Sequence, residues 1–378
     1  MSYTKEQLAR SCHTEAELTY RYGGNSLAFF GLTPQNRHFL APDGEGLVSY
    51  RLVNNVAIVP GDPVCAPEAF EYVTRSFLDF CSRHEWRVAF YQASSRYLDM
   101  YRALKLQAFK IGEEAILHPQ TFTLNGSAMA NVRTSCRRAE RDGVTLDWYE
   151  GVPPMEVMQQ LRLVSDVWLM QKAGKNASET GFSTGRLDEL IYLAQQADII
   201  ATNSVGTNGP CAPRLVVGVA TTSSGKACAF VTFTPIYGYL TVDATAPGAQ
   251  CSKQEWGWTL DLMRRVPDAP PGVMELLLVR AIERFRSRGA QVVSMGMAAL
   301  TDTGQEMAPV QRQLASFIAN RLGILENRQT LFNFKQKFHP CWESRYLVTS
   351  AALALPKVAL ALFRLRNYVS GVFRRRIK

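Results

Sequence analysis

The sequence lacks the short motifs that identify the commonest nucleotide-binding and hydrolytic enzymes. It contains no P-loop, no G-x-G-x-x-G, no G-x-S-x-G and no H-E-x-x-H. These motifs carry the phosphate loops, the nucleophilic serine and the zinc ligands of large enzyme classes. Their absence excludes the usual ATPase, dehydrogenase, serine-hydrolase and zinc-protease interpretations.

Clustered cysteine is also missing. The eight cysteines include no C-x-x-C pair, and the five histidines do not accompany them in a cluster. Structural zinc sites and small disulfide-bonded folds depend on such clusters. We therefore expect no metal, and a protein of the reducing cytoplasm. The N-terminus has no apolar segment of the kind found in secretory signals.

The charge of the chain is concentrated at one end. The 378 residues carry a net charge of +9 and are enough for two domains. Residues 335–378 contain ten Lys or Arg and one acidic residue, Glu343, so this segment accounts for the whole net charge. The rest of the chain is neutral overall. A uniformly basic nucleic-acid binder is excluded, and DNA is not an expected partner. The terminal block favours contact with an anionic surface.

Apolar patterns predict two α/β stretches that join near the polar segment 149–154. The first contains strands at 47–53, 56–60 and 87–92 and helices at 67–84, 96–104 and 127–141. The second contains helices at 155–171 and 186–196, a β meander over 215–243, a helix that ends at Gly289, and a strand at 291–300. The predicted fold is α/β of the α+β type, with domains at 20–150 and 151–349 and a terminal segment at 350–378.

The terminal segment has apolar residues at helical spacing from Val358 onward. Its apolar run is interrupted at Pro356 and is too short to span a bilayer. We predict a basic amphipathic helix that lies in the headgroup plane of a membrane. The alternative is a terminal helix that docks on the core with its arginines in solvent. The membrane-binding cations would be Lys357, Arg364, Arg366, Arg374, Arg375 and Arg376.

Charged residues gather in two further segments. The stretch 261–275 contains several acids and arginines, and the stretch 331–347 interleaves charges with aromatic rings. Between them, Gly296 interrupts an apolar strand. Charge clusters of this kind mark functional sites in many proteins, although structural ion pairs produce them too.

These segments, together with GFSTGRLDEL (181–190), resemble the C-terminal catalytic domain of lysylphosphatidylglycerol synthases, the multiple peptide resistance factor family. The N-terminal half resembles it as well. The motifs there are VAIVPGDPV (56–64), AFYQ (89–92), KIGEEAILHPQTFTLNG (110–126) and RTSCRRAERDGV (133–144). The resemblance runs from about Asn25 to Leu347, with the motifs in the order of the family.

The resemblance implies a tandem pair of GNAT-like acyltransferase domains that work without a cofactor. An amino acid, lysine or alanine, would pass from its tRNA to the glycerol hydroxyl of phosphatidylglycerol in an anionic membrane. The product is a less anionic lipid of the kind that protects against cationic antimicrobial peptides. The acetyl-CoA loop of ordinary GNAT enzymes is absent, as a tRNA donor requires. The protein would be cytoplasmic and peripheral on the inner face of the cell membrane, in an oligomeric state that the sequence leaves open.

The resemblance also suggests roles for the charged residues. Asp261 and Glu275 would bind the α-ammonium of the donor or act as general base, and Arg264 would bind a phosphate or the ester oxyanion. The segment 331–347 would line the lipid-facing end of the site. The residues that would meet the lipid phosphate or the tRNA 3′ end are Lys335 and Arg345, oriented by Glu343, with Asp243 as a weaker candidate. Structural ion pairs, such as Glu343 with Arg345, are the alternative.

Three arginines share one face of the predicted helix at 127–141. Arg133, Arg137 and Arg141 are spaced at i, i+4 and i+8. They predict a contact with the tRNA backbone. A solvated face, balanced by Glu140 and Asp142, is the alternative.

Two other functions remain open. The first is an acyltransferase that uses a different donor or lipid acceptor, and the missing CoA loop counts against acyl-CoA. The second is a non-catalytic membrane-bound adaptor, which the acidic and basic residues of 261–275 and 335–345 disfavour. The best-known members of the family carry a membrane-spanning region before this domain. We therefore expect a stand-alone relative or the catalytic part of a longer protein.

Overall fold

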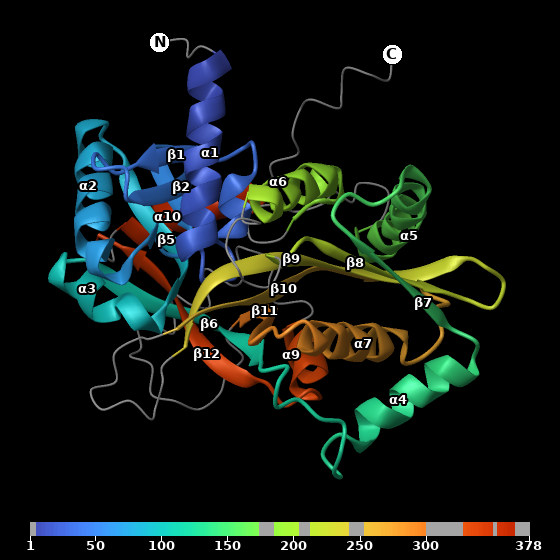
Figure 1. Ribbon diagram of the computed structural model, residues 1–378. Helices are drawn as coiled ribbons and strands as arrows, with labels where there is room; N and C mark the ends of the chain where they lie inside the picture. Colours follow the sequence, from blue (N-terminus) through green and yellow to red (C-terminus); the bar gives the residue numbers. More distant parts are fainter. Residues whose placement is uncertain are drawn as a thin grey trace.

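The computed structural model describes residues 5–173, 185–203, 212–241, 253–299, 328–350 and 354–366. Within these ranges, twelve strands form one mixed sheet with helices on both faces (Figure 1). The predicted mixed α/β fold is confirmed. The strands are β1 (Arg37–Leu40), β2 (Gly46–Val53), β3 (Val56–Pro60), β4 (Val64–Cys65), β5 (Arg87–Ser94), β6 (Gln107–Leu117), β7 (Thr145–Glu150), β8 (Val216–Thr221), β9 (Ala227–Thr241), β10 (Lys253–Arg265), β11 (Val292–Ala299) and β12 (Cys341–Thr349).

The helices form separate layers. Apolar residues of α1, α5 and α6 join one hydrophobic cluster with β8 and β9, and those of α4 and α7 join another on the opposite face (Figure 1). The helices are α1 (Lys5–Tyr22), α2 (Phe70–Arg83), α3 (Leu98–Ala103), α4 (Ala130–Arg141), α5 (Met155–Ala173), α6 (Leu190–Asn203), α7 (Val273–Ser287), α9 (Arg328–Gln336) and α10 (Leu355–Arg366).

The order of the strands is symmetric about the centre of the sheet. It reads β1-β2-β3-β5-β12-β6-β11-β10-β9-β8-β7, with β4 beside β2. The central pair β12–β6 is antiparallel. Outward from β12, β12–β5 is antiparallel, β5–β3 is parallel and β3–β2 is antiparallel. Outward from β6, β6–β11 is antiparallel, β11–β10 is parallel and β10–β9 is antiparallel. The parallel partners β3 and β5 are connected through α2, and β10 and β11 through α7. β6, from the first half of the sequence, therefore pairs with β11 of the second half, and β12, from the second half, pairs with β5 of the first. Glu343 lies opposite Glu114 in the central pair.

Most of the predicted elements are present. The strands at 47–53, 56–60 and 87–92 are β2, β3 and β5, and the helix that ends before Gly289 is α7. β10 and β12 were not predicted as strands, because charged residues interrupt their apolar pattern. The predicted boundary between two domains at 150/151 stays a prediction, since the sheet runs continuously across both parts and β7 pairs with β8.

The terminal helix α10 uses its apolar side within the fold. Val358, Leu362 and Leu365 are buried in a cluster with Val56 and Leu347 of the sheet. The prediction that this stripe lies in a membrane is therefore wrong for α10, and the docked alternative describes it, because packing on the sheet already removes the apolar surface from water.

The cations of the tail are only partly described. Lys357 and Arg364 are exposed, and Arg364 donates a hydrogen bond to Asn54 Oδ1 at 2.8 Å. Arg366 ends α10, and residues 374–376 lie outside the described residues. Among the helices of the described ranges, none has the length and apolar character needed to cross a bilayer.

Shortening a buried side chain of α10 should destabilise the protein in the absence of lipid. We expect Leu362→Ala to lower the free energy of unfolding by about 2–5 kcal/mol, because it leaves a cavity against the sheet. The exposed Lys357→Ala should change it by less than about 0.5 kcal/mol. Urea denaturation measures both values. A Leu362→Ala protein as stable as the parent would contradict the docking of α10.

Candidate active site

The candidate site lies where the parallel strands β10 and β11 stop pairing. Their register covers three residues on each strand and ends at Thr259 with Ser294. Immediately beyond, β10 bulges relative to β9 between Leu260 and Met263, and β11 bulges relative to β6 between Ser294 and Met297. Bulges redirect side chains and are common beside active sites. Ligands of α/β sheets also bind near the carboxyl ends of parallel strands.

Asp261 occupies the bulge of β10. Its carboxylate accepts hydrogen bonds from the Gly185 backbone N–H at 2.5 Å and from the Thr232 hydroxyl at 3.3 Å. A Cβ at Gly185 would lie 2.4 Å from Asp261 Oδ2, so a side chain there would collide with the carboxylate. Burial raises the pKa of Asp261 to about 7, against the effect of the Gly185 hydrogen bond. The carboxyl is therefore close to half-ionised at neutral pH, as suits a general base.

Arg264 follows on β10 and is held by α5. Its buried guanidinium hydrogen-bonds the hydroxyl of Ser165 and lies 5.1 Å above the ring of Trp168. The hydrogen bond and the cation–π contact fix its orientation before any ligand arrives. Its positive charge stabilises the Asp261 carboxylate and so opposes the rise in the pKa of Asp261 caused by burial.

Lys335 reaches the other strand from α9. Its Nζ donates to the backbone carbonyls of Gly296, at 2.8 Å, and Met297, at 3.2 Å. Gly296 has φ +78°, a conformation that favours glycine. A Cβ built there would lie 3.8 Å from Lys335 Nζ and 4.0 Å from the carbonyl oxygen of Leu260, so Lys335 and β10 both approach this glycine. Burial lowers the pKa of Lys335 to about 7.

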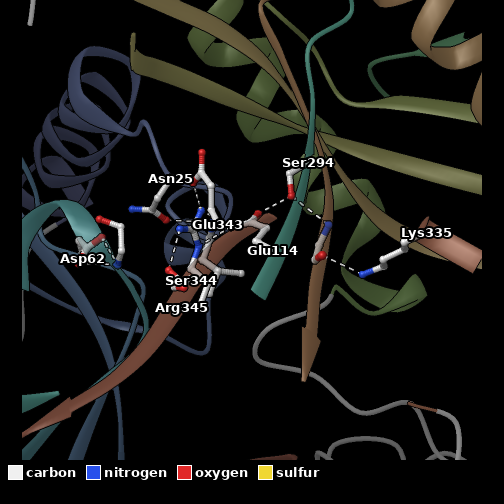
Figure 2. A network of polar contacts seen from close by, with 11 residues as sticks. Asn25, Asp62, Glu114, Ser294, Lys335, Glu343, Ser344 and Arg345 are labelled. Carbon is white, nitrogen blue, oxygen red and sulfur yellow. Dashed lines mark hydrogen bonds and ion pairs between the residues drawn. The ribbon is translucent and has the colours of Figure 1, made fainter. Parts of the chain in front are cut away.

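A buried acid connects this lysine with the centre of the sheet (Figure 2). Glu114 of β6 accepts hydrogen bonds from the Ser294 hydroxyl and from Arg345 Nε, the latter at 2.6 Å. Ser294 Oγ also accepts the Gly296 N–H at 2.9 Å. Burial raises the pKa of Glu114, but Arg345 and the hydrogen bonds outweigh it and hold that pKa below its ordinary value. Lys335, Gly296, Ser294, Glu114 and Arg345 therefore form one continuous polar chain.

Arg345 is bound by two acids. Its guanidinium pairs with Glu114 and, at 2.9 Å, with Glu343. Arg345 is 7% exposed and Lys335 is 3% exposed. Arg345 lies on β12 in the middle of the sheet and Lys335 on α9, and both are buried. Their contact with the lipid phosphate or the tRNA 3′ end stays a prediction. The structural ion pair considered for Glu343 and Arg345 is present.

The structure separates the remaining predicted residues. Glu275, in the first turn of α7, pairs with Lys337 at 2.9 Å rather than with Asp261. Arg133 donates to the carbonyls of Leu124 and, at 2.7 Å, Gly126, so it fixes the loop before α4. Arg137 and Arg141 are exposed, and Asp243 lies outside the described residues.

The sequence analysis named neither Glu114 nor Ser294 as a site residue. The available signal was an acidic pair, Glu113–Glu114, inside the apolar segment 110–117. A carboxylate in a buried strand requires a charged partner. That partner, Arg345, is 231 residues away in the sequence and is brought beside Glu114 only by the strand exchange.

The stability of the protein should depend on pH through Lys335. The pKa of this lysine is near 10.5 when unfolded and about 7 when folded, so between these values the unfolded state binds more protons. Its contribution to the free energy of unfolding therefore rises with pH, by up to about 1.4 kcal/mol per pH unit. Lys335→Met should remove that slope between pH 7.5 and 8.5, as measured by urea denaturation. The half-exposed Lys337→Met is the control, and equal slopes in all three proteins would contradict the assignment.

Glu114 should be critical for folding. Glu114→Gln removes the buried charge that faces Arg345, and we expect a loss of about 3–5 kcal/mol in the free energy of unfolding. Glu343→Gln should cost less, because the side chain of Glu343 is 39% exposed and Glu114 remains in place. Thermal and urea unfolding distinguish the two variants. Equal losses of stability would contradict the greater importance of Glu114, because Arg345 would then depend equally on Glu343.

Comparisons with known proteins identify the family. The family model described as "Phosphatidylglycerol lysyltransferase, C-terminal" matches residues 16–349. Phosphatidylglycerol lysyltransferase of Bacillus subtilis is 29% identical over 328 residues, which cover 86% of this chain and 33% of that protein. The chain spans about a third of the length of such curated relatives.

Two solved structures are similar over their whole length. L-PGS from Bacillus licheniformis has a TM-score of 0.74 and 26% identity and covers 94% of this chain and 96% of its own. The C-terminal domain of a protein described as a lysylphosphatidylglycerol synthetase, from Agrobacterium fabrum, has a TM-score of 0.75 and 25% identity, with coverage of 96% and 99%. The predicted resemblance is confirmed: this chain belongs to the family of phosphatidylglycerol lysyltransferase C-terminal domains.

Proposed function

We propose that this chain transfers an amino acid from an aminoacyl-tRNA to the glycerol hydroxyl of phosphatidylglycerol. The observation that carries the proposal is the placement of half-buried Asp261 and of buried Lys335 at the point where β10 and β11 stop pairing. The pKa values of both groups, each about 7, suit proton transfer. The names of the relatives support phosphatidylglycerol as the acceptor and lysine as the amino acid, with alanine as the alternative.

The proposed reaction exchanges one ester for another. The lipid hydroxyl oxygen bonds to the carbonyl carbon of the aminoacyl ester, and the tetrahedral intermediate collapses by releasing the ribose oxygen of the tRNA. A base takes the proton of the attacking hydroxyl and returns it to the departing ribose oxygen. The donor ester is already activated, so no further reactant is needed.

The residues of the site can divide these tasks. Asp261 in its carboxylate form would act as the base, because a pKa near 7 leaves it ionised in a useful fraction and basic enough to accept a proton. Lys335 in its protonated form would stabilise the oxyanion. Arg264, already oriented by Ser165 and Trp168, would meet the lipid phosphate or the oxyanion. Glu275 with Lys337 would bind a charged group of either substrate at the start of α7.

We further propose that the chain consists of two GNAT-like units, 20–150 and 151–349, which exchange β6 and β12. The symmetric strand order supports this arrangement. In the first unit Asp62 corresponds to Asp261, since each lies two residues beyond the last paired residue of its parallel strand. The buried carboxylate of Asp62 accepts hydrogen bonds from the Tyr101 hydroxyl at 2.9 Å and from the Ser94 N–H at 3.0 Å. Because Asp62 is buried with these partners, we place the chemistry in the second unit alone.

The tRNA would approach from α4. Arg137 and Arg141 are exposed on this helix, and they would neutralise phosphates of the acceptor stem. Arg133 would contribute indirectly, because its guanidinium fixes the loop before α4. The cations Lys357 and Arg364 would add attraction to an anionic membrane.

Substitution of Asp261 tests the proposal. Purified protein is given vesicles that contain phosphatidylglycerol, and tRNA charged with labelled lysine or alanine. Label should enter the lipid fraction, and Asp261→Asn should slow this transfer by about 100-fold or more through loss of the base. Asp268→Asn, an exposed acid on the same segment, is the matched control.

The outcomes separate the candidate functions. Unchanged transfer by Asp261→Asn would remove this residue from the mechanism. Absence of transfer from either tRNA by the parent protein would contradict the proposed reaction and favour the adaptor or a different donor.

A further inference from the structure

Large apolar side chains are exposed together along α5. In the described part of the chain, Leu163, Val167 and Met170 are 68%, 42% and 61% exposed. Their spacing of i, i+4 and i+7 places them on one side of the helix. We call these three residues the α5 apolar face. Met155, at the start of α5, and Ile199, on α6, are also exposed.

The opposite side of α5 belongs to the core and to the candidate site. Leu161 and Val164 are buried in the cluster that covers β8 and β9. Ser165 and Trp168 hold the guanidinium of Arg264, three residues from Asp261. A single helix therefore contacts the site on one side and exposes aliphatic side chains on the other.

We propose that the α5 apolar face docks on the surface of a lipid bilayer and inserts its three side chains among the headgroups. The inference rests on the proposed function, because it takes the acceptor to be a membrane lipid. A helix with side chains is about 10–12 Å across. Docking through this face holds Arg264 about one helix diameter from the headgroup plane.

The size of the face favours lipid over a second protein. An aliphatic patch of three side chains covers on the order of a few hundred Å². A stable protein dimer buries about 800 Å² on each partner and places aromatic residues and Arg at its centre. Interfacial helices combine an apolar face with polar flanks. Here the flanks are the exposed Arg162 and Asp166.

The packing of α10 also favours the α5 apolar face as the membrane contact. The apolar stripe of that helix, including Val358 and Leu362, is buried on the sheet and has no surface left for a bilayer. Exposed cations such as Lys357 supply only salt-sensitive attraction. The α5 apolar face supplies a contact that depends little on salt.

Flotation with vesicles tests the proposal on the full chain. Vesicles of phosphatidylglycerol and phosphatidylcholine are mixed with the parent protein, with Leu163→Asp/Met170→Asp, and with Tyr72→Ser. Tyr72 is an exposed apolar residue of α2 and serves as the matched control. Circular dichroism and thermal unfolding confirm that each variant is folded, which the exposure of the replaced side chains favours. The single variant Val167→Ser repeats the test with a milder change.

We expect the double variant to bind vesicles at least tenfold more weakly, both near physiological salt and near 1 M salt, where the Debye length is about 3 Å. Tyr72→Ser should bind like the parent. Parent-like binding of the double variant at both salt concentrations would overturn the proposal. So would a dimer in analytical ultracentrifugation that the double variant dissociates without loss of vesicle binding, because the face would then contact a second copy.

Vesicle binding is measured without tRNA, so it is independent of catalysis. If the double variant fails to bind and no protein transfers label, the docking surface stands and the proposed reaction fails. If transfer proceeds and binding is unaffected, the reaction stands and the docking surface fails.

Discussion

The buried ion pair between Glu114 and Arg345 is the interaction on which the arrangement depends. Glu114 comes from β6 and Arg345 from β12, the two strands that the halves of the molecule exchange. Neither charge is tolerable in the middle of a sheet without the other. Removal of either partner would leave an uncompensated buried charge between the two central strands. Through Ser294 it also fixes the bulge of β11 that carries Gly296.

The bulges convert a continuous sheet into a site. At the end of the β10–β11 pairing, one bulge exposes the carboxylate of Asp261 to Gly185 and Thr232, and the other presents backbone carbonyls to Lys335. Burial raises the pKa of Asp261 and lowers the pKa of Lys335, so both pKa values are about 7. Groups with pKa values near the operating pH suit general acid–base catalysis.

Much of the fold could be predicted from local pattern, and the site only in part. Strands such as 56–60 and helix α7 have uninterrupted apolar periodicity, which dominates local structure. β10 and β12 carry Asp261, Arg264, Glu343 and Arg345 inside the sheet, and those charges hide the strand pattern. The residue types of the site were recognisable, but their partners were not, because Glu114 and Arg345 meet through long-range strand exchange. The apolar stripe of the tail had the pattern of a membrane helix, yet the same pattern serves a helix docked on a sheet.

The most direct test of the account is the pH dependence of transfer under single-turnover conditions. If the Asp261 carboxylate is the base and protonated Lys335 stabilises the oxyanion, the rate should pass through a maximum near pH 7 and fall on both sides. Asp261→Asn should remove the acidic limb, and Lys335→Met the alkaline limb. A rate that stays constant from about pH 5.5 to 8.5 would contradict the central claim that Asp261 and Lys335 perform the proton transfer and charge stabilisation.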